Sequence, residues 1–145
     1  VSQVAAIRSG DGRGGAQAAS MRPIVMNISD DDIRDIAAFY ATQTGTTESV
    51  SAAAAEQGGT LYRGGDEKAG IPACMSCHGP AGEGNTLAGY PRLAGQHAPY
   101  TSAQLQAYRS GERSTDPNSM MRTISKRLSD DQIESLSAFL SALGR

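Results

Sequence analysis

The 145-residue sequence has no tryptophan, two phenylalanines and two cysteines, and it holds few large side chains from which to build a hydrophobic core. Valine, isoleucine, leucine and phenylalanine together make up 22 residues, about 15% of the chain. This share lies below the roughly 20% under which disorder becomes the default. Disordered chains also carry a large net charge, however, and the formal net charge here is -2. We therefore expect a folded protein whose core is completed by something other than side chains.

The sequence also lacks an excess of either charge and any long apolar run. Its 13 basic and 15 acidic residues argue against a nucleic-acid partner, because a nucleic-acid surface needs basic side chains gathered into a patch. The apolar stretches are short and rich in alanine, far below the roughly 20 residues that cross a bilayer. Peripheral association with a membrane stays open.

Apolar spacing predicts an all-α fold with long loops and no strand. Ser29 and Ser129 are each followed by aspartates and mark two helix starts, because a hydroxyl caps free N–H groups and carboxylates favour the positive end of the helix dipole. We expect helices at residues 1–10, 29–44, 48–62, 99–108 and 129–143, with short ones around the cysteines and around the methionine pair 120–121. Residues 11–20 and most of 65–99 are rich in small residues and should be loops.

An internal repeat relates residues 21–41 to residues 121–141, with nine of 21 positions identical at an offset of 100. Upstream it continues at an offset of 101, where Gln3, Arg8, Ser9 and Gly10 face Gln104, Arg109, Ser110 and Gly111. We interpret the chain as a partial first domain over residues 1–45 and a complete domain over 46–145. The first domain's cysteines would then fall before Val1, so we expect the chain to begin within a unit.

Cys74, Cys77 and His78 form a C-x-x-C-H motif, the attachment signature of c-type haem. Two thiols on one helical turn can add to both vinyl groups of a porphyrin, and the adjoining imidazole then reaches the iron. The alternatives are a redox-active C-x-x-C pair and half of a zinc site. A closed zinc site needs four ligands, and His97 is the only other histidine. A thioredoxin-like pair is expected within a βαβ unit, which the sequence does not predict. Covalent haem is favoured, and it would also supply the missing apolar volume.

A low-spin haem needs a sixth ligand, and methionine sulfur is the usual partner of histidine in electron carriers. Met75 lies inside the attachment motif and cannot reach the opposite face, whereas Met120 and Met121 follow a predicted helix. Met121 has Met21 as its counterpart in the repeat, while Met120 faces a serine, so the repeat favours Met121. Ordinary core packing is the alternative for this pair. We predict His78 and Met121 as the iron ligands.

Further elements follow in order along the chain: Cys74–Pro80, Gly82–Asn85, Tyr90–His97, Gln104–Leu105, Tyr108–Gly111, Met120–Met121 and Leu128–Asp131. Together they resemble the second half of the two-haem cytochrome c4 family, which is built from two class I cytochrome c domains. Residues 1–45 resemble the closing half of that family's first domain, without its attachment motif. The resemblance implies a class I cytochrome c domain preceded by the C-terminal half of another. If the intact protein carries the first motif, Met21 is the expected sixth ligand of a second haem.

The resemblance also implies roles for the loop before residue 100. Pro91 should offer its carbonyl to Nδ1–H of the proximal His78, which orients the imidazole ring. A plain loop proline is the alternative. The candidates to hold the haem propionates, which can equally be solvated surface side chains, are Arg92, Gln96 and Tyr100. His97 is interpreted as a surface or propionate-side residue and not as a ligand.

These features favour an electron carrier over an enzyme. With His78 and Met121 on the two sides of the iron, no substrate reaches the metal. The family implies a periplasmic carrier with one covalent haem c in this chain, acting between a cytochrome bc1-type donor and a terminal oxidase. The alternatives are the cytochrome subunit of a dehydrogenase such as a flavocytochrome c, a haem enzyme with an open distal site, and a ligand sensor. Haem attachment to C-x-x-C-H takes place outside the bacterial inner membrane, so the periplasm is expected.

Overall fold

The computed structural model describes residues 2–10, 15–43 and 51–143. Its helices are α1 (Ser2–Ser9), α2 (Gly15–Val25), α3 (Asp30–Ala41), α4 (Ala52–Gly64), α5 (Met75–His78), α6 (Ala98–Ser110), α7 (Met120–Ser125) and α8 (Asp130–Ala142), with a 3₁₀ turn η1 (Pro117–Ser119) before α7. Within those ranges there is no strand, and the only β pairing is two isolated bridges, Asp66–Ile71 and Asn85–Tyr90. The predicted all-α fold with long loops is confirmed.

Two of the expected boundaries need comment. Residues 15–20 are the first part of α2 and not a loop, so that expectation is wrong there. Alanine is the best helix former, and the alanines of this stretch outweigh its glycine once α1 packs beside it. Helix α4 begins after Ser51, whose hydroxyl accepts a hydrogen bond from the N–H of Ala54 at 3.2 Å. The expected start at residues 48–50 lies outside the described residues.

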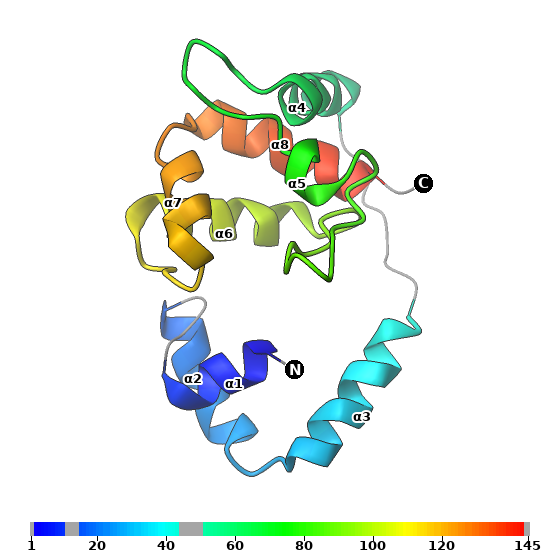
Figure 1. Cartoon of the computed structure of the whole chain (residues 1–145), viewed down its shortest axis with the longest axis vertical. Coiled ribbons are helices and arrows are strands. Elements are labelled where there is room, and N and C mark those ends of the chain that lie inside the picture. The colour runs from blue at the N-terminus through cyan, green and yellow to red at the C-terminus, as the bar shows by residue number, and fades with distance from the viewer. Residues whose placement is uncertain (1, 11–14, 44–50, 144–145) are drawn as a thin grey trace.

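Helix α8 is the centre of the larger part of the fold, as Figure 1 shows in orange and red. Helices α4 and α6 both pack against α8, and α7 packs against α6. The buried apolar residues of this core are Leu61, Tyr62, Ile71, Leu128, Ile133, Leu136, Phe139 and Leu140. The crossing of α4 over α8 is close because Gly58 has no side chain: a Cβ there would lie 2.0 Å from the carbonyl oxygen of Ser135.

Helices α1, α2 and α3 form the lower part of the view in Figure 1, and α1 packs against α2. Their buried apolar residues are Val25 and Ile33. Large apolar side chains elsewhere on α2 and α3 are exposed, namely Met21, Ile24, Ile36, Phe39 and Tyr40. No helix in the described ranges combines the length and apolar composition of a membrane span.

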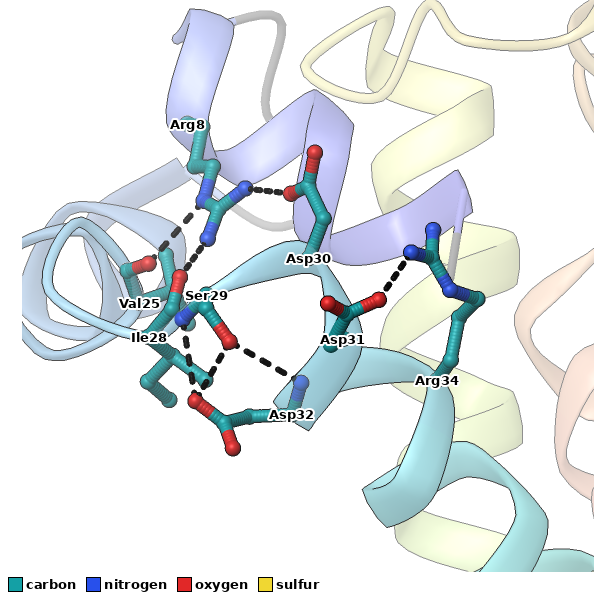
Figure 2. A network of polar contacts seen from close by, with 8 residues as sticks. All are labelled: Arg8, Val25, Ile28, Ser29, Asp30, Asp31, Asp32 and Arg34. Atoms are coloured by element: carbon teal, nitrogen blue, oxygen red, sulfur yellow. Dashed lines mark hydrogen bonds and ion pairs between the residues drawn. The ribbon is translucent and has the colours of Figure 1, made fainter.

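The internal repeat is also visible in the hydrogen bonds that one arginine makes in each copy. Arg8 donates to the carbonyl of Val25 at 3.0 Å, to the carbonyl of Ile28 and to the carboxylate of Asp30 at 2.5 Å (Figure 2). In the second copy Arg109 donates to the carbonyl of Leu128 at 3.2 Å and to Asp130 at 2.5 Å.

The two serine caps that begin α3 and α8 also form in the same way. Ser29 and Ser129 each accept the N–H three residues later at 3.1 Å. Asp32 and Gln132 close the two capping boxes from the third helical position (Figure 2 shows the first). The two copies therefore share their local hydrogen bonding.

Candidate haem site

The C-x-x-C-H motif occupies a single helical turn. Cys74 is the N-cap residue of α5, and its carbonyl accepts the N–H of His78 at 3.0 Å. Both cysteines are half-buried. Gly79 ends the turn with a φ of 81°, and its carbonyl accepts the hydroxyl of Tyr62, a fully buried α4 residue, at 2.6 Å. The attachment turn is thus held on the α4–α8 framework by a hydrogen bond directly after His78.

The imidazole of His78 is buried, and its Nδ1 lies 2.9 Å from the carbonyl oxygen of Pro91. A carbonyl only accepts hydrogen bonds, so Nδ1 carries the proton and Nε2 keeps its lone pair. Burial lowers the pKa of His78, while the Pro91 contact acts in the opposite direction. The side chain is therefore a neutral imidazole with one nitrogen fixed and the other available to a metal. This contact is the one that the family resemblance implies for Pro91.

The loop that carries Pro91 is itself held against the attachment turn. The N–H of Gly84 donates to the carbonyl of His78 at 2.8 Å. An isolated bridge then pairs Asn85 with Tyr90 and closes the loop of residues 85–90. Gly84 has a φ of 78°, and a Cβ there would lie 2.6 Å from the carbonyl carbon of Pro91. Only glycine fits this approach, which brings the Pro91 carbonyl within reach of the imidazole.

The donor set fits haem better than it fits zinc or dithiol chemistry. Burial raises the pKa of Cys74 to about 11, so its sulfur is a neutral thiol near neutral pH and a poor nucleophile for disulfide exchange. Across residues 2–10, 15–43 and 51–143, no three His, Cys, Asp or Glu side chains gather into a metal-binding group. Two thiols and one imidazole Nε2 on a single turn are the groups that a covalent haem uses.

The two candidate sulfur ligands occupy the first turn of α7. Met120 and Met121 are its first two residues, and both are half-buried. Helix α7 packs on α6 whereas α5 packs on α4, so different helices carry the histidine and the methionines, and α8 joins the two sides. Met21, the repeat counterpart of Met121, lies on α2 and is exposed.

The candidate propionate residues lie along the segment that leads into α6. Arg92 is exposed, and its Nε donates to the carbonyl of Ala94 at 3.4 Å. The side-chain oxygen of Gln96 accepts the N–H of His97 at 2.9 Å, and Tyr100 is exposed on the first turn of α6. These contacts are local to the segment.

Sequence reasoning missed the ion pair between Asp116 and Arg122, in the segment that carries the methionines. The two residues are separated by a proline and two residues with left-handed backbone, so no helical periodicity links them. The proline directly after Asp116 and the arginine directly after Met121 were the only signals.

Comparison with known proteins adds to this geometry. Residues 55–144 match the sequence profile of the cytochrome c family. The chain belongs to the cytochrome c family. It is 44% identical over 126 residues to the cytochrome c4 of Thiocapsa roseopersicina, covering 86% of this chain and 66% of that protein. It superposes on the crystal structure of reduced recombinant cytochrome c4 from Pseudomonas stutzeri with a TM-score of 0.86 and 39% identity, covering 97% of this chain and 77% of that one.

A further relative has a different name. The chain is 37% identical to a protein of Stutzerimonas stutzeri named thiosulfate dehydrogenase electron acceptor, covering 86% of this chain and 59% of that protein. The chain thus spans less than two thirds of the length of these curated relatives. Within the cytochrome c family it is a member of the cytochrome c4 group, and as such it carries covalent haem c.

Proposed function

We propose that this cytochrome c domain is an electron carrier whose haem is attached to Cys74 and Cys77 and ligated by His78 and Met121. The observation that carries the proposal is the fixed imidazole: Nδ1 of His78 is 2.9 Å from the Pro91 carbonyl, which leaves Nε2 for iron. The haem supplies a one-electron iron couple. The protein's part is to hold His78 in one orientation and one tautomer, so that little rearrangement accompanies oxidation or reduction.

With His78 and Met121 as its two protein ligands, the haem iron would have no position open to oxygen species or organic substrates, so the chain would act as a carrier and not as an enzyme. Methionine sulfur also favours the ferrous state and raises the reduction potential. The buried setting of His78 acts in the same direction, since a low-dielectric site disfavours the extra positive charge of ferric iron. Arg92, with Gln96 and Tyr100, is proposed to meet the propionates.

Optical spectra of the holoprotein test this assignment. A ferric protein with the long-wavelength charge-transfer band of methionine-ligated haem, and a ferrous spectrum unchanged by carbon monoxide, are expected. Binding of carbon monoxide at neutral pH would instead support the open-site alternatives, an enzyme or a sensor. Mass spectrometry should find one haem on this chain, because it contains one C-x-x-C-H motif.

Two kinds of redox partner are proposed. The cytochrome c4 resemblance favours a respiratory role in the periplasm, between a bc1-type donor and a terminal oxidase, free or peripherally attached to the membrane. The relative named thiosulfate dehydrogenase electron acceptor favours a dehydrogenase as donor. Reduction of the purified holoprotein by each donor in stopped-flow kinetics distinguishes them: a physiological donor should show saturable reduction that falls as ionic strength rises.

We further propose that residues 1–45 close a second haem domain whose other elements lie in the intact protein. In the repeat, Phe39 corresponds to Phe139 and Tyr40 to Leu140. Phe39 is 61% exposed whereas Phe139 is 7% exposed, and Tyr40 is 68% exposed whereas Leu140 is 4% exposed. Phe139 is covered by α4, so the exposed stripe of α3 is where an equivalent helix would pack. Two haems on the intact protein would support this division at residue 45, and one haem would contradict it.

A further inference from the structure

The segment between α6 and α7 has an unusual backbone immediately before the two methionines. Asn118 and Ser119 have φ values of 54° and 56°, and they are the only non-glycine residues with positive φ among those the structure describes. Two successive left-handed residues with side chains are strained, and such a conformation persists only when the surroundings enforce it. Something must therefore hold the chain in this shape just before Met120.

A single carboxylate provides that restraint. The side chain of Asp116 is 2% exposed; one oxygen accepts the backbone N–H of Arg122 at 3.0 Å and the other accepts its Nε at 2.8 Å. Ser119, the residue at the N-cap of α7, makes no side-chain cap, so Asp116 satisfies the third N–H of the helix in its place. The carbonyl of Asp116 also accepts the N–H of Ser119 at 3.3 Å. The chain from 116 to 122 is thus closed into a ring that contains both methionines.

The segment just before this ring is attached to α6 through Arg113. Arg113 is buried; it donates to the side chain of Gln104 at 2.7 Å, and its guanidinium lies 4.3 Å from the centre of the Tyr108 ring.

Burial raises the pKa of Asp116, but the hydrogen bonds from the backbone and side chain of Arg122 outweigh it and lower that pKa below its ordinary value. Asp116 therefore stays ionised in its buried position, and the pair with Arg122 persists at neutral pH.

The first copy of the repeat lacks this arrangement. At an offset of 100 the arginine is kept as Arg22. Asp116, however, corresponds to Ala16 at an offset of 100 and to Gly15 at an offset of 101, so the first copy has no carboxylate there. The pair is therefore not a general requirement of the repeated helix–turn–helix unit. It occurs in the copy whose methionine lies in the same domain as the C-x-x-C-H motif.

We propose that the Asp116–Arg122 pair is a positioning device for the axial methionine: it holds the first turn of α7 so that the sulfur of Met121 stays on the iron. This inference rests on the proposed His78/Met121 ligation. Without the pair, the strained turn at residues 118–119 relaxes and the sulfur dissociates more often, while the covalent attachment at Cys74 and Cys77 is untouched. The sixth position then becomes accessible to small external ligands.

The test compares imidazole binding to the ferric holoprotein in wild type and Asp116→Asn, followed by loss of the methionine charge-transfer band. Asparagine is nearly isosteric but lacks the charge. Imidazole should bind about tenfold more tightly, since its apparent affinity rises with the fraction of protein whose sulfur is off the iron. Arg122→Lys keeps a positive charge and the backbone N–H, so its affinity should lie between those of wild type and Asp116→Asn. The reduction potential should fall in the same order.

Asp130→Asn is the matched control, because it breaks an exposed Arg–Asp pair in the same domain at the start of α8. Its imidazole affinity should stay within about twofold of wild type, even if its unfolding midpoint falls as far as that of Asp116→Asn. Equal affinities in Asp116→Asn and Asp130→Asn would overturn the inference. Should Asp116→Asn give no folded holoprotein, Arg122→Lys decides: an affinity equal to wild type overturns the inference, and a higher one supports it.

The two levels of the argument fail in different ways. If wild type itself shows no methionine charge-transfer band, the proposed ligation is wrong and the inference falls with it. If wild type shows the band and Asp116→Asn leaves both band and affinity unchanged, the ligation stands and only the positioning role is refuted.

Discussion

Gly58→Ala tests the close crossing of α4 over α8. The added Cβ would lie 2.0 Å from the carbonyl oxygen of Ser135 and 2.8 Å from Cβ of Phe139, whereas ordinary contacts begin near 3.4 Å. Helices α4 and α8 would have to separate by roughly 1.4 Å. Because the nearest atoms are backbone, they cannot swing away as a flexible side chain would.

The expected size follows from two opposing effects. Alanine is favoured over glycine in a helix by about 1 kcal/mol. Overpacking a close-packed interior costs about 1–3 kcal/mol and sometimes more, and this clash is with rigid backbone, so the upper end applies. We expect a net loss of about 2 kcal/mol in the free energy of unfolding, and a fall in Tm of about 10 °C for a domain of this size.

Two neighbouring glycines provide graded controls in the same helix. A Cβ on Gly64 would meet no atom within 4 Å, so Gly64→Ala should be neutral or stabilising by a few tenths of a kcal/mol. A Cβ on Gly59 would meet the tip of Arg63 at 2.9 Å and the Phe139 ring at 3.0 Å, and these side chains can move aside. The loss of stability in Gly59→Ala should therefore lie between those of Gly64→Ala and Gly58→Ala. Thermal unfolding of the holoproteins, followed by far-UV circular dichroism, measures all three. The same Tm for Gly58→Ala and Gly64→Ala would refute the reasoning.

Two further predictions concern the haem site. Met121→Ala should lower the reduction potential and admit carbon monoxide while leaving the haem attached, and Met120→Ala should do neither; spectra and potentiometry showing the reverse would make Met120 the ligand. Burial raises the pKa of Tyr62 to about 12. Its neutral form therefore stabilises the fold below pH 10, and that contribution is lost as pH rises toward 12. Tyr62→Phe should therefore be about 1–2 kcal/mol less stable than wild type at pH 7, because the Gly79 carbonyl loses its donor. Denaturant unfolding should show that the difference in free energy of unfolding between wild type and Tyr62→Phe becomes smaller above pH 10. A difference that does not change with pH would contradict the raised pKa of Tyr62.

Local signals in the sequence predicted the parts of the fold that depend on neighbouring residues. Ser29 and Ser129 begin their helices as expected, because a cap acts within one turn. The α5 turn follows from the motif itself. The start of α2 was missed because glycine and alanine in one stretch suggest opposite structures, and packing against α1 decides between them.

The non-local features of the site could not be derived from periodicity. The contact of His78 with Pro91 joins the last residue of α5 to a residue of a following loop, and only the family resemblance implied it. The Asp116–Arg122 pair depends on a backbone conformation at residues 118–119 that their sequence alone does not favour. The Tyr62 hydroxyl reaches Gly79 because α4 is fixed on α8, which the sequence of neither element specifies.

The repeat separates local from tertiary causes within one chain. Helices α3 and α8 both form, and each has a serine cap, aspartates in its first turn and a hydrogen bond from an upstream arginine. Their apolar stripes nevertheless differ in burial, because α8 has α4 and α6 against it whereas the outer stripe of α3, including Phe39, is exposed. A cap and a dipole can therefore start a helix, but they do not bury its apolar face; burial requires a partner element. In this protein the partner is what distinguishes the copy that holds the C-x-x-C-H motif, since α4 both covers Phe139 and carries the tyrosine that fixes the attachment turn.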